Sequence, residues 1–96
     1  MILEIATLSI LPGRQQEFET AFREARQIIV QADGCGAVSL QRCIETPGRY
    51  QVLVEWPSVE HHMKGFREST RFVEWRRILG PFFAAAPTVE HYDLAG

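Results

Sequence analysis

One amphipathic stretch, residues 14–32, constrains the fold of this chain most strongly. Apolar side chains recur there every three or four residues, which is the spacing of one helix face: Phe18, Ala21, Phe22, Ala25, Ile28, Ile29 and Ala32. Charged and amide side chains fill the opposite side, and the dipeptide Asp33-Gly34 follows, which is typical of a helix end. A helix with a single apolar face needs a surface to cover, and the rest of the chain predicts a β-sheet.

Four segments with strand character flank the predicted helices. They are residues 2–11, which end at Pro12-Gly13, and residues 36–45, 50–56 and 88–93. A turn at residues 46–49 joins the second and third segments, which predicts a hairpin. Between the third and fourth, Ser58 is placed to cap a helix that ends near residue 67 or 68, and another helix is predicted from residue 69 or 70 to Leu79. The order β-α-β-β-α(α)-β predicts an α+β, ferredoxin-like split β-α-β fold with a four-stranded antiparallel sheet.

The length of 96 residues suits one domain, spanning residues 1–96. Helices cover only one face of such a sheet, yet residues 2–11 and 50–56 carry apolar side chains on both faces of their strands. A second copy of the chain is the simplest cover for the bare face, through a self-complementary two-fold contact. We therefore expect a homodimer formed through the sheet face.

Composition argues against several classes of partner. Ten Lys and Arg against twelve Asp and Glu give a formal net charge of −2, which is unlike a binder of nucleic-acid backbones. No apolar stretch approaches the ~20 residues needed to cross a bilayer. We expect a cytoplasmic protein without a signal peptide or membrane contact. On one continuous strand Cys35 and Cys43 would lie ~26 Å apart, too far for a disulfide, so we expect two free thiols.

The most distinctive pattern begins at Trp56. Residues 56–67 read W-x-S-x-E-x-H-x-x-G-F-R, and they are followed by Phe72, Trp75, Phe82, Phe83 and then Val89-Glu90-His91-Tyr92. Over nearly the whole chain, from the first strand to the last, this layout resembles the antibiotic biosynthesis monooxygenase family, and in particular its small stand-alone members. The resemblance implies a dimeric α+β barrel. Relatives with this fold include quinol monooxygenases, haem-degrading enzymes and isomerases, so the resemblance implies fold better than function.

His62 is the candidate catalytic residue. On a helical wheel Val59, Met63 and Phe66 form an inward stripe, with His62 at its inner flank and His61 on the solvent side. The position of His62 in the motif selects the same residue. An unperturbed pKa of ~6.5 suits a general base near neutrality. The alternative is a partly buried histidine that only packs and donates hydrogen bonds.

Aromatic and basic side chains supply the candidate substrate-binding residues: Trp56, Phe66, Arg67, Trp75, Phe83 and His91. Most of the aromatic ones have a core position as their alternative, but a pocket with such walls also suits a flat phenolic ligand. Arg67 could steady a phenolate or pair with an acidic neighbour. Alternation on the last strand sends His91 and Tyr92 to opposite faces, and the sequence leaves open which of them faces the helices.

The chemistry that the resemblance implies is oxygen insertion into an electron-rich aromatic substrate without flavin, haem or metal. No dinucleotide-binding, P-loop or HExxH motif predicts a cofactor or metal, and we expect none. Haem-degrading relatives use an Asn with a Trp and a His, and this chain contains no asparagine, which argues against that reaction. The resemblance thus implies a cofactor-independent monooxygenase of small phenolic, quinol or polyketide-like aromatic substrates. A non-catalytic ligand-binding or stress-associated module and an isomerase of small carbonyl compounds stay open as alternatives.

Overall fold

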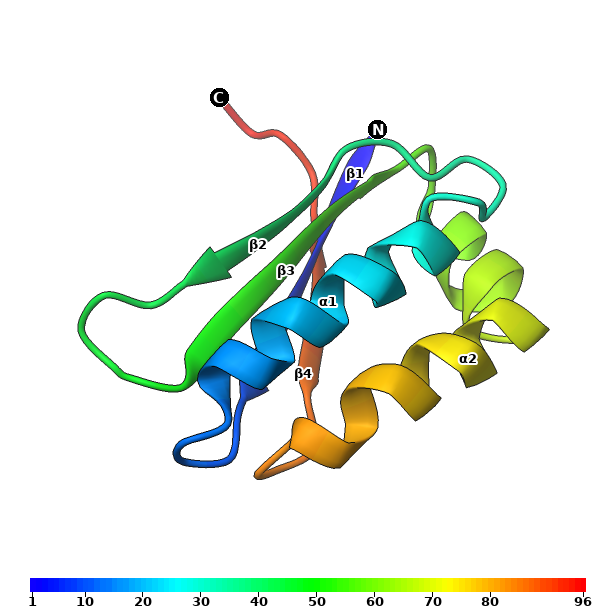
Figure 1. Cartoon of the computed structure of the whole chain (residues 1–96). Coiled ribbons are helices and arrows are strands. Elements are labelled where there is room, and N and C mark those ends of the chain that lie inside the picture. Colours follow the sequence, from blue (N-terminus) through cyan, green and yellow to red (C-terminus); the bar gives the residue numbers. More distant parts are fainter.

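The computed structural model describes residues 1–96, which form a four-stranded antiparallel sheet with two helices on one face (Figure 1). The sheet order is β2-β3-β1-β4. The elements in chain order are β1 (Ile2–Ser9), α1 (Gln15–Ile29), β2 (Val38–Arg42), β3 (Arg49–Trp56), the π-helical turn η1 (His61–Phe66), α2 (Thr70–Leu79), the 3-10 turn η2 (Gly80–Phe82) and β4 (Thr88–Tyr92). This is the ferredoxin-like α+β arrangement that the sequence predicts, and that prediction is confirmed.

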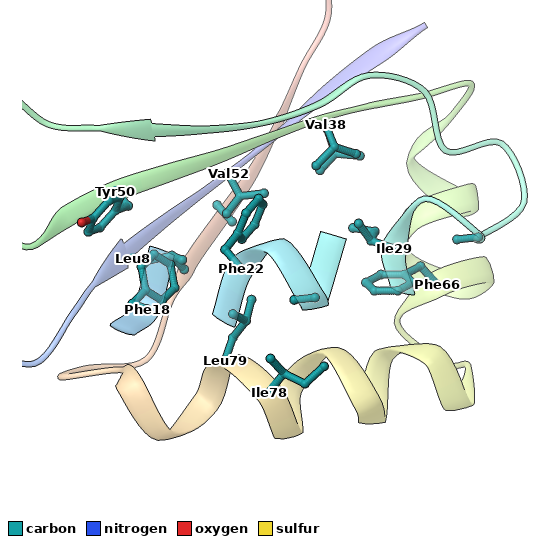
Figure 2. Packing of buried hydrophobic residues seen from close by; sticks show 14 of the residues in the cluster. Leu8, Phe18, Phe22, Ile29, Val38, Tyr50, Val52, Phe66, Ile78 and Leu79 are labelled. Atoms are coloured by element: carbon teal, nitrogen blue, oxygen red, sulfur yellow. The ribbon is translucent and has the colours of Figure 1, made fainter. Parts of the chain in front are cut away.

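The core lies between α1 and the sheet. Phe18, Phe22 and Ile29 of α1 are buried, as the apolar stripe predicts. Figure 2 shows Phe18 near Leu8 and Phe22 near Val52 of the sheet strands, and Ile29 near Phe66. Each large apolar side chain buried in this way stabilises the fold by about 1.5–3 kcal/mol. The second helix, α2, packs mainly along α1 rather than directly on the sheet. That arrangement leaves space between α2 and strands β1 and β4.

Strand register determines which side chains meet on the covered face of the sheet. Glu4 of β1 lies opposite His91 of the edge strand β4, and on its other side it pairs with Val54 of β3. Trp56 is the next residue of β3 on the same face, diagonal to Glu4. Glu4, Trp56 and His91, from distant parts of the sequence, are therefore neighbours at one end of the sheet.

The segment after β3 differs from the predicted helix. The N–H of Arg67 donates to the carbonyl of His62, five residues earlier, so the turn is a π-helix, which is wider than an α-helix. The predicted inward stripe is wrong for two of its members, because Val59 and Met63 are 41% and 36% exposed while His62 and Phe66 are buried. A wheel drawn at 100° per residue does not apply to a turn of this width.

His61 is also less exposed than predicted. Its ring is half-buried, its Nδ1 atom lies 2.9 Å from the Oγ of Ser58, and its backbone N–H donates to the same oxygen. A Cβ added at Gly34 would lie 2.8 Å from the His61 ring and 2.9 Å from Pro57, so the chain passes close here. The N-cap position of η1 itself is Glu60, whose side chain makes no cap hydrogen bond, so Ser58 only accepts a backbone hydrogen bond at the start of this segment.

The second strand is shorter than predicted. It ends at Arg42, and Ile44, expected on the same face as Val38, is 92% exposed beyond the strand end. Cys35 and Cys43 are both free thiols, as expected. None of the helices has the length and apolar character needed to cross a membrane.

Candidate functional site

A cavity of about 670 Å³ lies between the sheet and α2. Glu4, Ala6 and Leu8 of β1 form its floor, over a length of ~13 Å at ~3.3 Å per strand residue. Aromatic side chains from η1, α2 and the following loop form its walls: Phe66, Phe72, Trp75 and Phe83. Small residues line the far rim at positions 84–87. Its volume lies in the range of about 300–1,000 Å³ that is usual for small-molecule sites.

Glu4 is a carboxyl group held at one end of this cavity. It is 6% exposed, and its Oε1 atom accepts a hydrogen bond of 2.9 Å from the indole Nε1–H of Trp56. Its Oε2 atom has no hydrogen-bond partner in the chain. Every fully buried side-chain oxygen or nitrogen has such a partner, so Oε2 is not fully buried. Glu4 is one of the residues that line the cavity.

His62 lies directly over Glu4 and is only 2% exposed. Its Nε2 atom is 3.4 Å from Oε1 of Glu4, and its ring stacks on Trp56 with centroids 5.5 Å apart. The other ring nitrogen, Nδ1, is hydrogen-bonded to Nε2 of His91 at 2.8 Å. Each imidazole in such a pair has one donor and one acceptor nitrogen when neutral, so the protonation of the two rings is linked.

Burial shifts the acid–base properties of this pair in opposite directions. Burial raises the pKa of Glu4 to about 7, although the Trp56 hydrogen bond and the charge of Arg67 act to lower it. Burial lowers the pKa of His62 to about 4, and the charges of His91 and Arg67 add to this effect. At neutral pH His62 is thus a neutral imidazole, and the 3.4 Å contact with Glu4 is not an ion pair.

Arg67 is the cation nearest to this pair in the cavity wall. It follows η1 directly, and its guanidinium lies 5.2 Å from the centroid of the Phe72 ring, a cation–π contact. It makes no ion pair within the chain. A guanidinium without a carboxylate partner beside a titratable carboxyl group can stabilise an anion that forms in the cavity.

The structure places the sequence-derived site residues in two groups. His62, Phe66, Arg67, Trp75 and Phe83 line the cavity. Trp56 and His91 lie behind His62 and do not line it. Of the two candidates on the last strand, His91 faces the helices and Tyr92 is 48% exposed on the other face.

Sequence reasoning missed Glu4. It is the only charged residue in residues 2–11, and it is in phase with Ala6, Leu8 and Ile10, all of which are buried. A lone carboxyl on the core-facing side of an apolar strand is the signal that could have found it, because such groups are rarely buried without a partner. No group of three or more His, Cys, Asp or Glu side chains has an arrangement that could hold a metal ion.

Comparisons with known proteins agree with this fold. The family model described as "Antibiotic biosynthesis monooxygenase" matches residues 1–78, and the chain belongs to this family. It is 45% identical over 93 residues to the uncharacterized protein YczJ of Bacillus subtilis strain 168, a match that covers 97% of this chain and 98% of YczJ.

Solved structures show the same architecture. A protein from Bordetella bronchiseptica, called a "putative antibiotic biosynthesis monooxygenase", superposes with a TM-score of 0.95 at 42% identity, covering 98% of this chain and 96% of that one. SnoaB, a cofactor-independent oxygenase from Streptomyces nogalater, gives a TM-score of 0.82 at 13% identity, covering 99% and 93% of the two chains. At that identity the second likeness concerns the fold alone.

Proposed function

We propose that this protein is a cofactor-independent monooxygenase that converts a small hydroxyarene into a quinone with O₂. The observation that carries the proposal is the buried Glu4–His62 pair at one end of a cavity with aromatic walls. Family membership and the name of SnoaB are consistent with it. A carboxyl group with a pKa of about 7 is well matched to taking up a phenolic proton at neutral pH.

The reaction needs no external reductant. A phenol whose para carbon carries hydrogen reacts with one O₂ to give a quinone and one water, because the ring supplies all four electrons. Oε2 of Glu4 accepts the hydroxyl proton, and Arg67 stabilises the resulting phenolate. The phenolate then transfers an electron to O₂, and the two radicals combine at the para carbon. Loss of the para hydrogen with cleavage of the O–O bond forms the carbonyl group, and the proton held by Glu4 completes the water.

The shape and lining of the cavity support a substrate with fused rings. The floor extends ~13 Å along β1, and Phe66, Trp75 and Phe83 offer ring faces and edges for stacking. Exclusion of water by these side chains favours the charge transfer step, since solvent would stabilise the phenolate before it reacts. Neutral His62 contributes by holding Glu4 in place and by exchanging a proton with it.

Oxygen uptake with α-naphthol and a hydroxyanthracene tests this proposal. Glu4→Gln and His62→Ala should each lower turnover by at least ~10²-fold, the usual size of an acid–base contribution. Glu90→Gln is the matched carboxyl control on the bare sheet face, and His61→Ala the matched imidazole control, and both should stay within a few-fold of the parent. The rate of the parent should rise with pH through about 7 as Glu4 ionises.

Two results would overturn the proposal. One is oxygen uptake that is the same in the parent, Glu4→Gln and His62→Ala proteins. The other is the absence of uptake with every hydroxyarene tried although the ligand binds, which would favour a ligand-binding module.

A further inference from the structure

Glu4 needs a route for its proton when the cavity is filled. The carboxyl group is 6% exposed, and Glu4 lines the cavity that a hydroxyarene would occupy. A substrate that fills the cavity would cover this carboxyl group, and a Glu4 side chain that arrives protonated could then not act as a base. A path through the protein would remove this limit.

The two histidines behind Glu4 form such a path. From Oε1 of Glu4 the chain of atoms runs 3.4 Å to Nε2 of His62, across that ring to Nδ1, and then 2.8 Å to Nε2 of His91. The His62–His91 contact is a hydrogen bond. The Glu4–His62 contact is longer, and a displacement of about 0.5 Å brings it to hydrogen-bond length. Strand register supports the arrangement, because Glu4 and His91 are directly paired between β1 and β4.

The outer end of this path reaches solvent. His91 lies on β4, the edge strand of the sheet, and is half-buried. Its Nδ1 atom makes no hydrogen bond within the chain. Every fully buried side-chain nitrogen does have a hydrogen-bond partner, so Nδ1 is not fully buried and touches solvent. The inner end of the path is thus a cavity carboxyl group, and the outer end is a water-exposed imidazole nitrogen.

We propose that His62 and His91 form a proton relay that exchanges the proton of Glu4 with solvent while substrate fills the cavity. In the outward direction Glu4 donates a proton to Nε2 of His62, Nδ1 of His62 passes its proton to Nε2 of His91, and Nδ1 of His91 releases one to water. One proton leaves Glu4 and one reaches solvent, and both rings begin and end neutral. Protonation of Glu4 and the tautomers of both rings therefore change together.

Few other ionisable groups act on this relay. Arg67, beside η1, favours ionised Glu4 and neutral His62 through its charge. Cys35, from the loop after α1, has a raised pKa because of burial and the charge of Glu4. β3 contributes only the Trp56 indole, which does not titrate. The relay is accordingly expected to respond to Glu4 and not to a distant group.

Nitrogen NMR of the three histidines tests the relay without any substrate. Ring ¹⁵N shifts report which nitrogen carries the proton. Between pH 5 and pH 8, the ring of His62 should change tautomer as Glu4 ionises, and Glu4→Gln should abolish that step. A His62 tautomer that does not change, or a step that survives in Glu4→Gln, would overturn the relay whatever the enzyme activity.

Kinetics give a second test, which rests on the proposed oxygenase function. His91→Gln keeps a hydrogen bond to His62 but cannot pass a proton, so below pH 7 its turnover of α-naphthol should fall by at least several-fold. His91→Ala should fall similarly and be restored by imidazole, but not by pyrazole, which has the same shape and is far less basic. Tyr92→Phe, on the opposite face, is the control.

The two failures can be told apart. If His91→Gln turns over like the parent, His91 is not a relay. If the parent oxidises no hydroxyarene, the proposed function fails, and the NMR result alone decides on the relay.

Discussion

Replacing Glu4 or His62 with glutamine should give two proteins whose stabilities respond to pH in opposite directions. Burial raises the pKa of Glu4 from 4.5 to about 7, so the folded state holds its proton more tightly than the unfolded state does. The contribution of Glu4 to the free energy of unfolding is complete below pH 4.5 and is lost as the pH rises to about 7. A pKa shift of this size corresponds to about 3 kcal/mol of unfolding free energy.

His62 has the opposite sign. Burial lowers its pKa from 6.5 to about 4, so its contribution is complete above pH 6.5 and is lost as the pH falls to about 4. The magnitude is again about 3 kcal/mol. The two contributions nearly cancel in the parent protein, which should therefore show little pH dependence from this pair.

Urea unfolding between pH 4 and pH 7.5 measures the effect, as the difference between each variant and the parent. From pH 4.5 to pH 7, Glu4→Gln should gain about 3 kcal/mol relative to the parent. Between pH 4 and pH 6.5, His62→Gln should lose about the same amount. The difference removes contributions from all other titrating groups. If the free energy of unfolding of each variant runs parallel to that of the parent across this pH range, neither the pKa of Glu4 nor that of His62 is perturbed.

Three further outcomes are expected. Gly34→Ala should lower the free energy of unfolding in urea by ~1–3 kcal/mol more than Gly13→Ala. Both glycines have positive φ, but only a Cβ at position 34 would meet neighbours under 3 Å. Equal losses for the two variants would contradict the close contact at Gly34. A homodimer through the bare sheet face should bury about 2,000 Å² or more, so light scattering should give a dimer for the parent and a monomer for Ile5→Lys. Replacing Cys35 and Cys43 by serine should leave α-naphthol turnover within a few-fold, whereas a ~10²-fold loss would assign them a catalytic role.

Much of the fold could be predicted because it follows from local patterns. The apolar stripe of α1, the alternation in β1 and β3, and the turn residues at 12–13 and 46–49 each act over a few neighbours. Ser69 likewise accepts the N-cap hydrogen bond from Phe72 that begins α2. These features determine element order, and for a chain of this size the order allows few topologies.

The wide turn at residues 61–66 could not be predicted in the same way. A π-helix has no simple residue signature, and the hydrogen bond from Arg67 to His62, five residues earlier, is not indicated by any local residue pattern. The helical wheel placed His62 beside an inward stripe that includes Val59 and Met63. His62 is buried, but Val59 and Met63 are exposed, so the wheel does not explain its burial.

The candidate site was predictable only in part, because it depends on strand register. Trp56 and His62 belong to one motif, but their partner Glu4 lies 52 residues before Trp56 and meets it only across β1 and β3. His91 reaches His62 only because β4 pairs with β1. Perturbed pKa values of this kind come from burial and neighbours, which periodicity does not reveal.

Turnover of α-naphthol under ¹⁸O₂ is the measurement that tests the central proposal most directly. We expect naphthoquinone with one labelled oxygen atom and water with the other, formed by chelator-treated protein without added reductant. Glu4→Gln should form the labelled product at least ~10²-fold more slowly. Unlabelled quinone, or equal rates for the parent and Glu4→Gln, would contradict oxygen insertion at this cavity.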